Sequence, residues 1–143
     1  MNSEPELFPV TLHLRIDWSE MDVFGHVNNV MILKYIQASR VNYWEHIGLT
    51  KYMNLHKTGP MLASTNCVFK KPLHYPGNIS LHSRMEFIKN TSFGIQHRLL
   101  DDRGDLAAEA NDVMVMFDFT KNEKANFPIE LRRAAEDLEK RKF

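Results

Sequence analysis

Apolar and polar residues alternate with a period of two near the start of the chain, and a longer helical pattern follows. Residues 10–18 predict a half-buried strand whose inner face carries Val10, Leu12, Leu14, Ile16 and Trp18. Residues 30–47 contain no Pro or Gly and are rich in Met, Ile, Leu, Tyr and Trp. This run predicts a largely buried helix of about five turns, which Gly48 ends as a left-handed cap residue.

The second half of the chain repeats the strand pattern. Four further strands are expected at residues 61–71, 79–89, 93–99 and 106–119. Pro72 ends the first of these strands, and the turn residues at 76–78 and 90–92 lie between the next ones. Residues 101–105 have the composition of a hairpin turn. Residues 50–60 predict only a short irregular connection, and a polar, mostly solvated helix is expected after Pro128.

The expected order is therefore a strand, a long apolar helix, four consecutive strands and a polar helix. A helix this apolar must be covered on most sides, and a twisted antiparallel sheet that curls around it would cover it. The order predicts an α+β fold in which a curved antiparallel sheet of about five strands wraps around a long central helix. We expect one domain over residues 1–143, because no linker or repeat interrupts the pattern.

Composition narrows the classes of function. The chain is 43% hydrophobic, which suits a domain with a real core, and its 18 basic and 18 acidic residues cancel. No overall field therefore draws it to nucleic acid or to anionic lipid. No apolar run is long enough to span a membrane, and residues 1–9 do not have the pattern of a secretory signal. The cytoplasm is the expected location.

Several other chemistries have little support. Cys67 is the single cysteine, and its apolar neighbours indicate a small buried thiol rather than a nucleophile. The seven histidines have no metal-ligand spacing, and neither a P-loop nor a dinucleotide glycine pattern occurs. We expect no metal and no cofactor.

The segment before the long helix carries the main candidate chemistry. Residues 17–29 read Asp-Trp-Ser-Glu-Met-Asp-Val-Phe-Gly-His-Val-Asn-Asn. Asp22 and the Gly25 turn lie just ahead of the helix N-terminus, where free N–H groups and the helix dipole stabilise a developing oxyanion. Taken alone, the spacing favours a turn or capping role for Asp22 and a loop-orienting role for His26.

Together with Tyr35 and the Ala38-Ser39-Arg40 run, this segment resembles the signature of the 4-hydroxybenzoyl-CoA-thioesterase-like hotdog acyl-CoA thioesterases. The element order is similar over nearly the whole chain. The resemblance implies a hotdog fold and hydrolysis of an acyl-CoA thioester to free acid and coenzyme A. It also implies a homodimer or homotetramer with acyl-CoA in a groove between protomers. An acyl carrier protein is a second candidate carrier of the acyl group.

The resemblance also implies roles for individual residues. Asp22 corresponds to the catalytic carboxylate, which either attacks the thioester or acts as a base on water. The backbone N–H of Asn29 corresponds to the oxyanion donor, and His26 supports the site. The expected substrate-binding residues are Gly25, Val27, Asn28, Lys70 and Lys71. The two lysines end a predicted strand, and their charges suit the phosphates of coenzyme A.

Two alternatives use the same fold differently. A hotdog hydratase or dehydratase needs an acid and a base, for which Asp22 and His26 are the obvious pair. The (R)-specific hydratase pattern resembles Asp-x-Asn-Pro-x-His, and the intervening residues here are too few and lack Asn-Pro. A non-catalytic acyl-thioester binding module is the other alternative, but no extension that could report binding is evident. Hydrolysis is the preferred interpretation.

Overall fold

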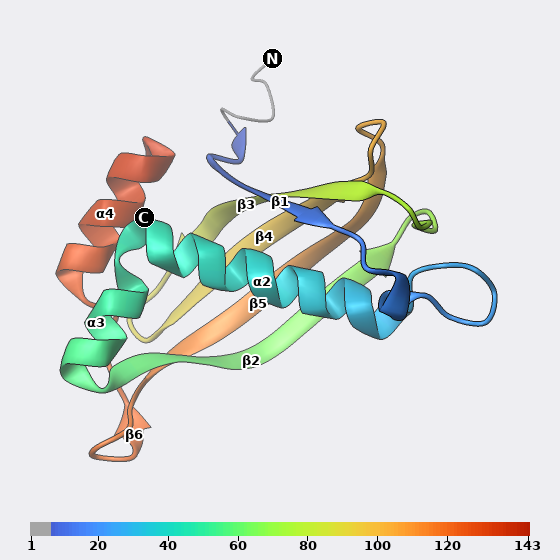
Figure 1. Ribbon diagram of the computed structural model, residues 1–143. Coiled ribbons are helices and arrows are strands. Elements are labelled where there is room, and N and C mark those ends of the chain that lie inside the picture. Colours follow the sequence, from blue (N-terminus) through green and yellow to red (C-terminus); the bar gives the residue numbers. More distant parts are fainter. Residues whose placement is uncertain (1–6) are drawn as a thin grey trace.

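The computed structural model describes residues 7–143, which form one antiparallel sheet and the helices that cover it. The strands are β1 (Val10–Arg15), β2 (Thr58–Phe69), β3 (Asn78–Ile88), β4 (Ser92–Leu100), β5 (Leu106–Asp118) and β6 (Glu123–Lys124). The helices are η1 (Trp18–Glu20), α2 (Asn29–Ile47), α3 (Leu49–His56) and α4 (Ile129–Glu139). The sheet order is β1-β3-β4-β5-β2, with β6 paired to β5. The sheet curls around α2 (Figure 1), which confirms the predicted hotdog arrangement.

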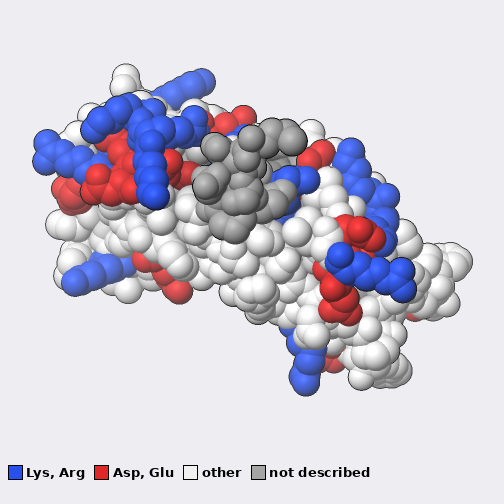
Figure 2. Space-filling model, turned by 90° about the horizontal axis from the view of Figure 1, so that it is seen from above, with Lys and Arg blue, Asp and Glu red and all other residues white. Residues whose placement is uncertain are grey.

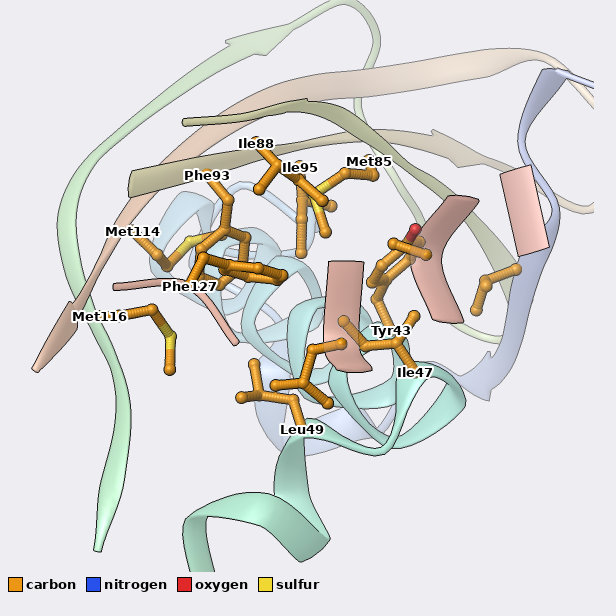
Figure 3. Close-up of a cluster of buried hydrophobic side chains, with 13 residues drawn as sticks. Tyr43, Ile47, Leu49, Met85, Ile88, Phe93, Ile95, Met114, Met116 and Phe127 are labelled. Atoms are coloured by element: carbon orange, nitrogen blue, oxygen red, sulfur yellow. The ribbon is translucent and has the colours of Figure 1, made fainter. Parts of the chain in front are cut away.

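One face of α2 fills the inside of the curled sheet. Ile32 and Ile36 belong to a buried cluster near the start of the helix, and Tyr43 and Ile47 belong to a second cluster near its end. In Figure 3, side chains from α2, β3, β4 and β5 converge in this second cluster. The 3.6-residue period of the helix therefore points one stripe of apolar residues at the sheet.

The opposite face of α2 is less covered than the sequence predicted. Val30 and Leu33 are 64% and 40% exposed. The edge strand β2 is also open, since residues 61–66 are all exposed and only β5 pairs with it. The helix is thus buried by the sheet on one side only.

Gly48 separates two helices. It has the predicted left-handed conformation, with φ +84°, and its N–H donates to the Glu45 and Trp44 carbonyls. The same residue is the N-cap of α3, so the expectation of an irregular connection at 50–60 is wrong. The glycine lets the chain change direction and continue as a helix until Lys57, whose φ is +52°.

The predicted first strand stops early, at Arg15. Asp17 then starts the turn η1, because its carboxylate accepts the Ser19 N–H while Glu20 accepts the Asp17 N–H, a reciprocal capping box. This turn carries Trp18 out of the inner face, where its side chain is 72% exposed. The predicted burial of Trp18 is therefore wrong.

The C-terminal helix α4 follows Pro128 as expected and completes the sheet edge. Register pairs β1 with β3 only as far as Ser83, so among residues 7–143 the next part of β3 has β4 on one side and no strand on the other. There the Glu139 carboxylate accepts the Met85 N–H, and Arg141 donates to the Met85 carbonyl at 2.6 Å. The helix was predicted to be mostly solvated, but Glu139 at its end and Arg141 just after it cover an open strand edge.

Charged side chains of both signs intermingle at both ends of the face seen in Figure 2, in line with a net charge of zero. Residues 1–6, which include most of the segment expected not to be a secretory signal, lie outside the described residues. Within residues 7–143, the longest apolar helices fall short of what a membrane crossing requires.

Candidate active site

Asp22 lies in a tight loop between η1 and α2, and this loop projects from the body of the protein (Figure 1). The Asp22 N–H donates to the His26 carbonyl at 2.7 Å. Asp22 Oδ1 accepts the Phe24 N–H at 2.8 Å and the His26 N–H at 3.1 Å. Gly25 supports the turn with φ +80°, a conformation that favours glycine. The other carboxylate oxygen, Asp22 Oδ2, has no hydrogen-bond donor among residues 7–143.

The base of this loop is tied to the body of the protein. Met21 and Val27 form an isolated antiparallel bridge, and the Val27 N–H donates to the Leu73 carbonyl at 2.9 Å. The Asn28 N–H donates to the Glu20 carbonyl at 2.9 Å. Val27 was expected to bind substrate, but its side chain is 3% exposed and lies in the core. It anchors the loop.

Glu20 connects the start of this loop to α2 through its side chain. Its buried carboxylate accepts the Tyr35 hydroxyl at 2.7 Å and the Asp17 N–H at 2.8 Å, with Lys34 Nζ at 3.5 Å. Burial acts to raise the pKa of Glu20, but these donors together outweigh it and lower that pKa. Burial and the Glu20 carboxylate raise the pKa of Tyr35. The motif glutamate and tyrosine therefore form one structural contact.

The N-terminus of α2 leaves one backbone donor free beside this loop. Asn28 is the N-cap, and its Oδ1 accepts the Val30 N–H at 2.9 Å. Its carbonyl accepts the Met31 and Ile32 N–H groups at 2.9 and 3.2 Å. Within the described part of the chain, no acceptor takes the Asn29 N–H. An anion at this end of the helix would meet that N–H and the positive end of the helix dipole.

A hollow of about 500 Å³ opens next to Asp22. Its lining residues are Trp18, Ser19, Met21, Asp22, Val23, Gly25 and Tyr75. Trp18 and Tyr75 are 72% and 46% exposed, which is unusual for such large side chains. Trp18 was predicted to lie on the apolar face of a half-buried strand, and Tyr75 carried no prediction. An aromatic residue directly before the Pro-Gly turn at 76–77 was the available signal.

His26 contacts the Asp22 carboxylate through its backbone N–H. The imidazole packs edge-on against His74, with ring centroids 5.0 Å apart. Within residues 7–143, the hydrogen bonds between His26 and Asp22 are made by main-chain groups of His26. This geometry fits a residue that orients the loop.

Both lysines expected to meet phosphates already have acidic partners. Lys70 Nζ lies 3.6 Å from the Glu109 carboxylate. Lys71 Nζ lies 2.7 Å from Asp101 and 3.1 Å from Asp105, and these two hydrogen bonds raise the pKa of Lys71. A phosphate at either lysine would have to share it with a carboxylate.

Other candidate groups fall outside the site. Cys67 is partly buried, and burial raises the pKa of its thiol, so the thiolate is disfavoured. Among residues 7–143, no three His, Cys, Asp or Glu side chains lie close enough together to hold a metal ion.

A second polar cluster lies between α2 and the sheet. Asp112 Oδ2 accepts the Arg40 Nε–H at 2.8 Å and the His97 Nε2–H at 2.7 Å, and Oδ1 accepts the Thr65 hydroxyl at 2.7 Å. Because Nε2 carries the proton, His97 Nδ1 accepts the Ser39 hydroxyl at 2.9 Å. This cluster was not predicted from the sequence, because its members come from four different elements.

The cluster holds one full ion pair. Burial acts to raise the pKa of Asp112, but the hydrogen bonds from His97, Arg40 and Thr65 together outweigh it and lower that pKa to about 2. Burial lowers the pKa of His97, so the imidazole is neutral. Asp112 therefore carries the negative charge that balances Arg40.

The curled sheet, the single long helix and the carboxylate loop at the helix N-terminus define a hotdog-fold protein. The sequence model of the thioesterase-like superfamily matches residues 16–135, and the chain belongs to that family. This membership confirms the recognised family and identifies an enzyme of the thioester hydrolase class.

Known relatives cover nearly the full length. Long-chain acyl-CoA thioesterase FadM of Escherichia coli (strain K12) is 22% identical over 129 residues, which are 89% of this chain and 97% of FadM. A thioesterase from Thermus thermophilus, solved in complex with coenzyme A and zinc, has a TM-score of 0.85 at 23% identity, over 96% of this chain and 99% of that one. DHNA-CoA thioesterase from Staphylococcus aureus has a TM-score of 0.81 at 12% identity, over 91% and 90%. The structural similarities establish the fold.

Proposed function

We propose that this protein hydrolyses an acyl-CoA thioester to a free acid and coenzyme A, with Asp22 as the reacting carboxylate. The observation that supports this proposal most directly is the hydrogen bonding of the two Asp22 carboxylate oxygens. Two backbone N–H groups hold Oδ1, while Oδ2 is open within the described chain beside a hollow of about 500 Å³. The names of FadM and of the Thermus protein, which refer to acyl-CoA and coenzyme A, support acyl-CoA as the substrate class.

The chemistry needs one carboxylate and one oxyanion donor. In the first route, Asp22 Oδ2 attacks the thioester carbonyl, the C–S bond breaks, and coenzyme A leaves as a thiolate. Water then hydrolyses the resulting mixed anhydride and restores Asp22. In the second route, Asp22 takes a proton from the water that attacks the carbonyl, the C–S bond breaks, and the proton passes to the departing coenzyme A thiolate. In both routes the free Asn29 N–H donates to the oxyanion.

The other motif residues support this site indirectly. Gly25 keeps the loop tight, Asn28 caps the helix, and His26 holds Asp22 through backbone hydrogen bonds. A hydratase would need Asp22 and His26 as an acid and base pair. The imidazole of His26 packs on His74 instead, so this arrangement favours hydrolysis.

A second copy of the chain would complete the site. The outer edge of β2 is unpaired in the described chain, and Met61 and Phe69 on it are 48% and 44% exposed. Exposed apolar edge strands are pairing surfaces, so this edge supports the expected homodimer or homotetramer. Light scattering should give a multiple of 16.7 kDa, and a monomer at micromolar concentration would contradict this part of the proposal.

The decisive variant is Asp22→Asn. The asparagine side-chain oxygen can still accept the Phe24 and His26 N–H groups, so the loop is kept while the negative charge is lost. Thiol release from short-chain, long-chain, phenylacetyl and hydroxybenzoyl-CoA should fall by about 10²–10⁴-fold. Asp137→Asn, on the exposed side of α4, is the matched control and should keep wild-type rates.

Two outcomes would contradict the proposal in different ways. Wild-type turnover by Asp22→Asn would refute the role of Asp22. No release from any acyl-CoA by folded wild-type protein would indicate an acyl-carrier-protein substrate or a binding module.

A further inference from the structure

Glu20 lies between the two groups that the proposed reaction needs. Asp22 follows it by two residues, and the Asn29 N–H opens the helix on the other side of the loop. The Glu20 carbonyl accepts the Asn28 N–H at 2.9 Å, so one hydrogen bond joins the chain before Asp22 to the cap of α2. The distance from the Asp22 carboxylate to the Asn29 N–H therefore depends on where Glu20 is held.

The side chain of Glu20 is held by α2 itself. Glu20 is 6% exposed, and Tyr35, in the second turn of the helix, is 3% exposed. Glu20 Oε1 accepts the Tyr35 hydroxyl at 2.7 Å and the Asp17 N–H at 2.8 Å. Any shift of the loop against the helix would break a buried hydrogen bond and leave polar groups without partners. The contact therefore fixes the loop relative to α2.

The remaining connections of the loop cannot replace this contact. The Met21–Val27 bridge closes the loop on itself, and the Val27 N–H binds the Leu73 carbonyl in the segment before β3. Neither contact includes a residue of α2. Lys34, which does belong to the helix, has a 68% exposed side chain 3.5 Å from Glu20, and such a surface ion pair adds little.

We propose that Glu20 and Tyr35 are positioning residues for the reaction at Asp22, an inference that rests on the proposed function. Their hydrogen bond sets the distance between the Asp22 carboxylate and the Asn29 N–H. Both groups must reach the same thioester carbonyl, one at its carbon or at the attacking water and the other at its oxygen. Rates fall steeply when such groups are displaced by even 1 Å. Neither positioning residue needs to touch the substrate.

A second contact of the same kind allows positioning to be separated from general stability. Tyr43, further along α2 and 0% exposed, donates its hydroxyl to Glu139 Oε1 at 2.8 Å. That oxygen also accepts a backbone N–H, from Met85. This contact joins α2 to β3 and the end of α4, and it does not involve the Asp22 loop. Tyr43 is therefore a matched control for Tyr35.

Tyr35→Phe removes the hydroxyl and keeps the ring. The kcat for acyl-CoA should fall by about tenfold with KM within about twofold of wild type, because alignment in the transition state is lost while the ligand contacts stay. Tyr43→Phe removes the same group from the same helix. It should lose a similar amount of thermal stability and keep kcat within about twofold.

Variants of Glu20 test whether the hydrogen bonds carry the effect. Glu20→Gln keeps a side-chain oxygen that can accept from Tyr35 and from the Asp17 N–H, so its kcat should stay within about threefold of wild type. Glu20→Ala removes that acceptor, and its kcat should fall by about 10²-fold.

Amide hydrogen exchange gives a readout that does not depend on turnover. Asp22 Oδ1 accepts the Phe24 and His26 N–H groups in the loop. Both should exchange faster in Tyr35→Phe, because the loop opens more often, and at the wild-type rate in Tyr43→Phe.

The outcomes separate this inference from the proposed function. Wild-type kcat or unchanged loop exchange in Tyr35→Phe would overturn the positioning role even though hydrolysis occurs. Equal losses of kcat in Tyr35→Phe and Tyr43→Phe would assign the effect to stability and overturn it too, as would a Glu20→Gln variant no faster than Glu20→Ala. Faster loop exchange in Tyr35→Phe alone, with no hydrolysis of any acyl-CoA by wild type, would support the hold on the loop and contradict the thioesterase proposal.

Discussion

Asp22 and Asp112 are both hydrogen-bonded carboxylates, and the molecule holds them in opposite ways. Asp22 lies in a projecting loop, where two local N–H groups hold one oxygen and the other is open within residues 7–143. Asp112 is 0% exposed, and Arg40, His97 and Thr65 occupy both of its oxygens. One carboxylate is available to a ligand, and the other is entirely committed to protein groups.

The difference shows how this fold separates stability from chemistry. The Asp112 donors come from α2, β4 and β2, so the cluster joins the helix to the sheet through long-range contacts. The Asp22 donors are at most four residues away in sequence. The buried charges are satisfied by one another inside the protein. The reactive group lies on a separate local loop, where it can stay open to solvent.

Removing the buried carboxylate should have the largest effect on stability. Asp112→Ala leaves Arg40 charged and unpaired in the interior, so the free energy of unfolding should drop by about 3–5 kcal/mol. Chemical denaturation measures this loss. Turnover per folded molecule should stay within a few fold of wild type, in contrast to Asp22→Asn.

A second change isolates the cause. In Arg40→Met/Asp112→Ala, the uncompensated charge is gone, and much of the lost stability should return. A double variant no more stable than Asp112→Ala would indicate that packing, and not the unpaired charge, carries the loss.

In the Asp22 site, the proposed oxyanion donor, the Asn29 N–H, can be removed by mutation. Asn29 is the first residue of α2, and Asn28 before it has φ −61° and ψ 138°, a conformation that proline accepts in its preceding residue. Asn29→Pro therefore deletes the free N–H with little effect on the helix. The kcat for acyl-CoA should fall by about 10²–10³-fold.

Asn29→Ala is its matched control, since it keeps the N–H and loses only the side chain. Equal kcat values in the proline and alanine variants would exclude the Asn29 N–H as the oxyanion donor. Circular dichroism should give the same helix content for both.

Acid should destabilise the buried cluster in two steps. The pKa of His97 is lowered on folding, so the unfolded chain binds its proton first and stability declines below about pH 6.5. The pKa of Asp112 falls from 3.8 to about 2, so its contribution, about 2 kcal/mol, is complete above pH 3.8 and is lost as the pH falls towards 2. Denaturation curves from pH 7 to pH 2.5 should show both losses, and Arg40→Met/Asp112→Ala should lose less stability below pH 4 than wild type, since the lowered pKa values of the remaining carboxylates still contribute there. A wild-type curve that is flat below pH 4 would contradict the assignment to Asp112.

The smallest expected effect comes from Thr65. Thr65→Val keeps the shape of the side chain and removes the hydroxyl donor to Asp112 Oδ1, which should cost about 1.5 kcal/mol of unfolding free energy. Ser64→Ala, an exposed change on the same strand, should cost far less. If the two variants have equal stability, the Thr65 hydrogen bond contributes nothing.

Much of the fold could be predicted because the signals are local. Alternation identified the main strands, Gly48 ended α2, and residues 101–105 formed the turn between β4 and β5. The motif also gave the Asp22 loop and its place at the helix start. The errors arose from local signals that were not recognised: the Asp17–Glu20 capping box turns Trp18 outward with η1, and the chain after Gly48 forms α3.

The sequence by itself determined the local chemistry of this protein: a carboxylate, a glycine turn and a helix cap within a few residues of each other. Such features depend on backbone preferences and hydrogen bonds between near neighbours. Only the tertiary structure decided that Tyr75 stands with Trp18 beside Asp22, and that Asp112 meets Arg40, His97 and Thr65. Those meetings follow from strand register and sheet curvature, which bring together residues that no short stretch of sequence relates.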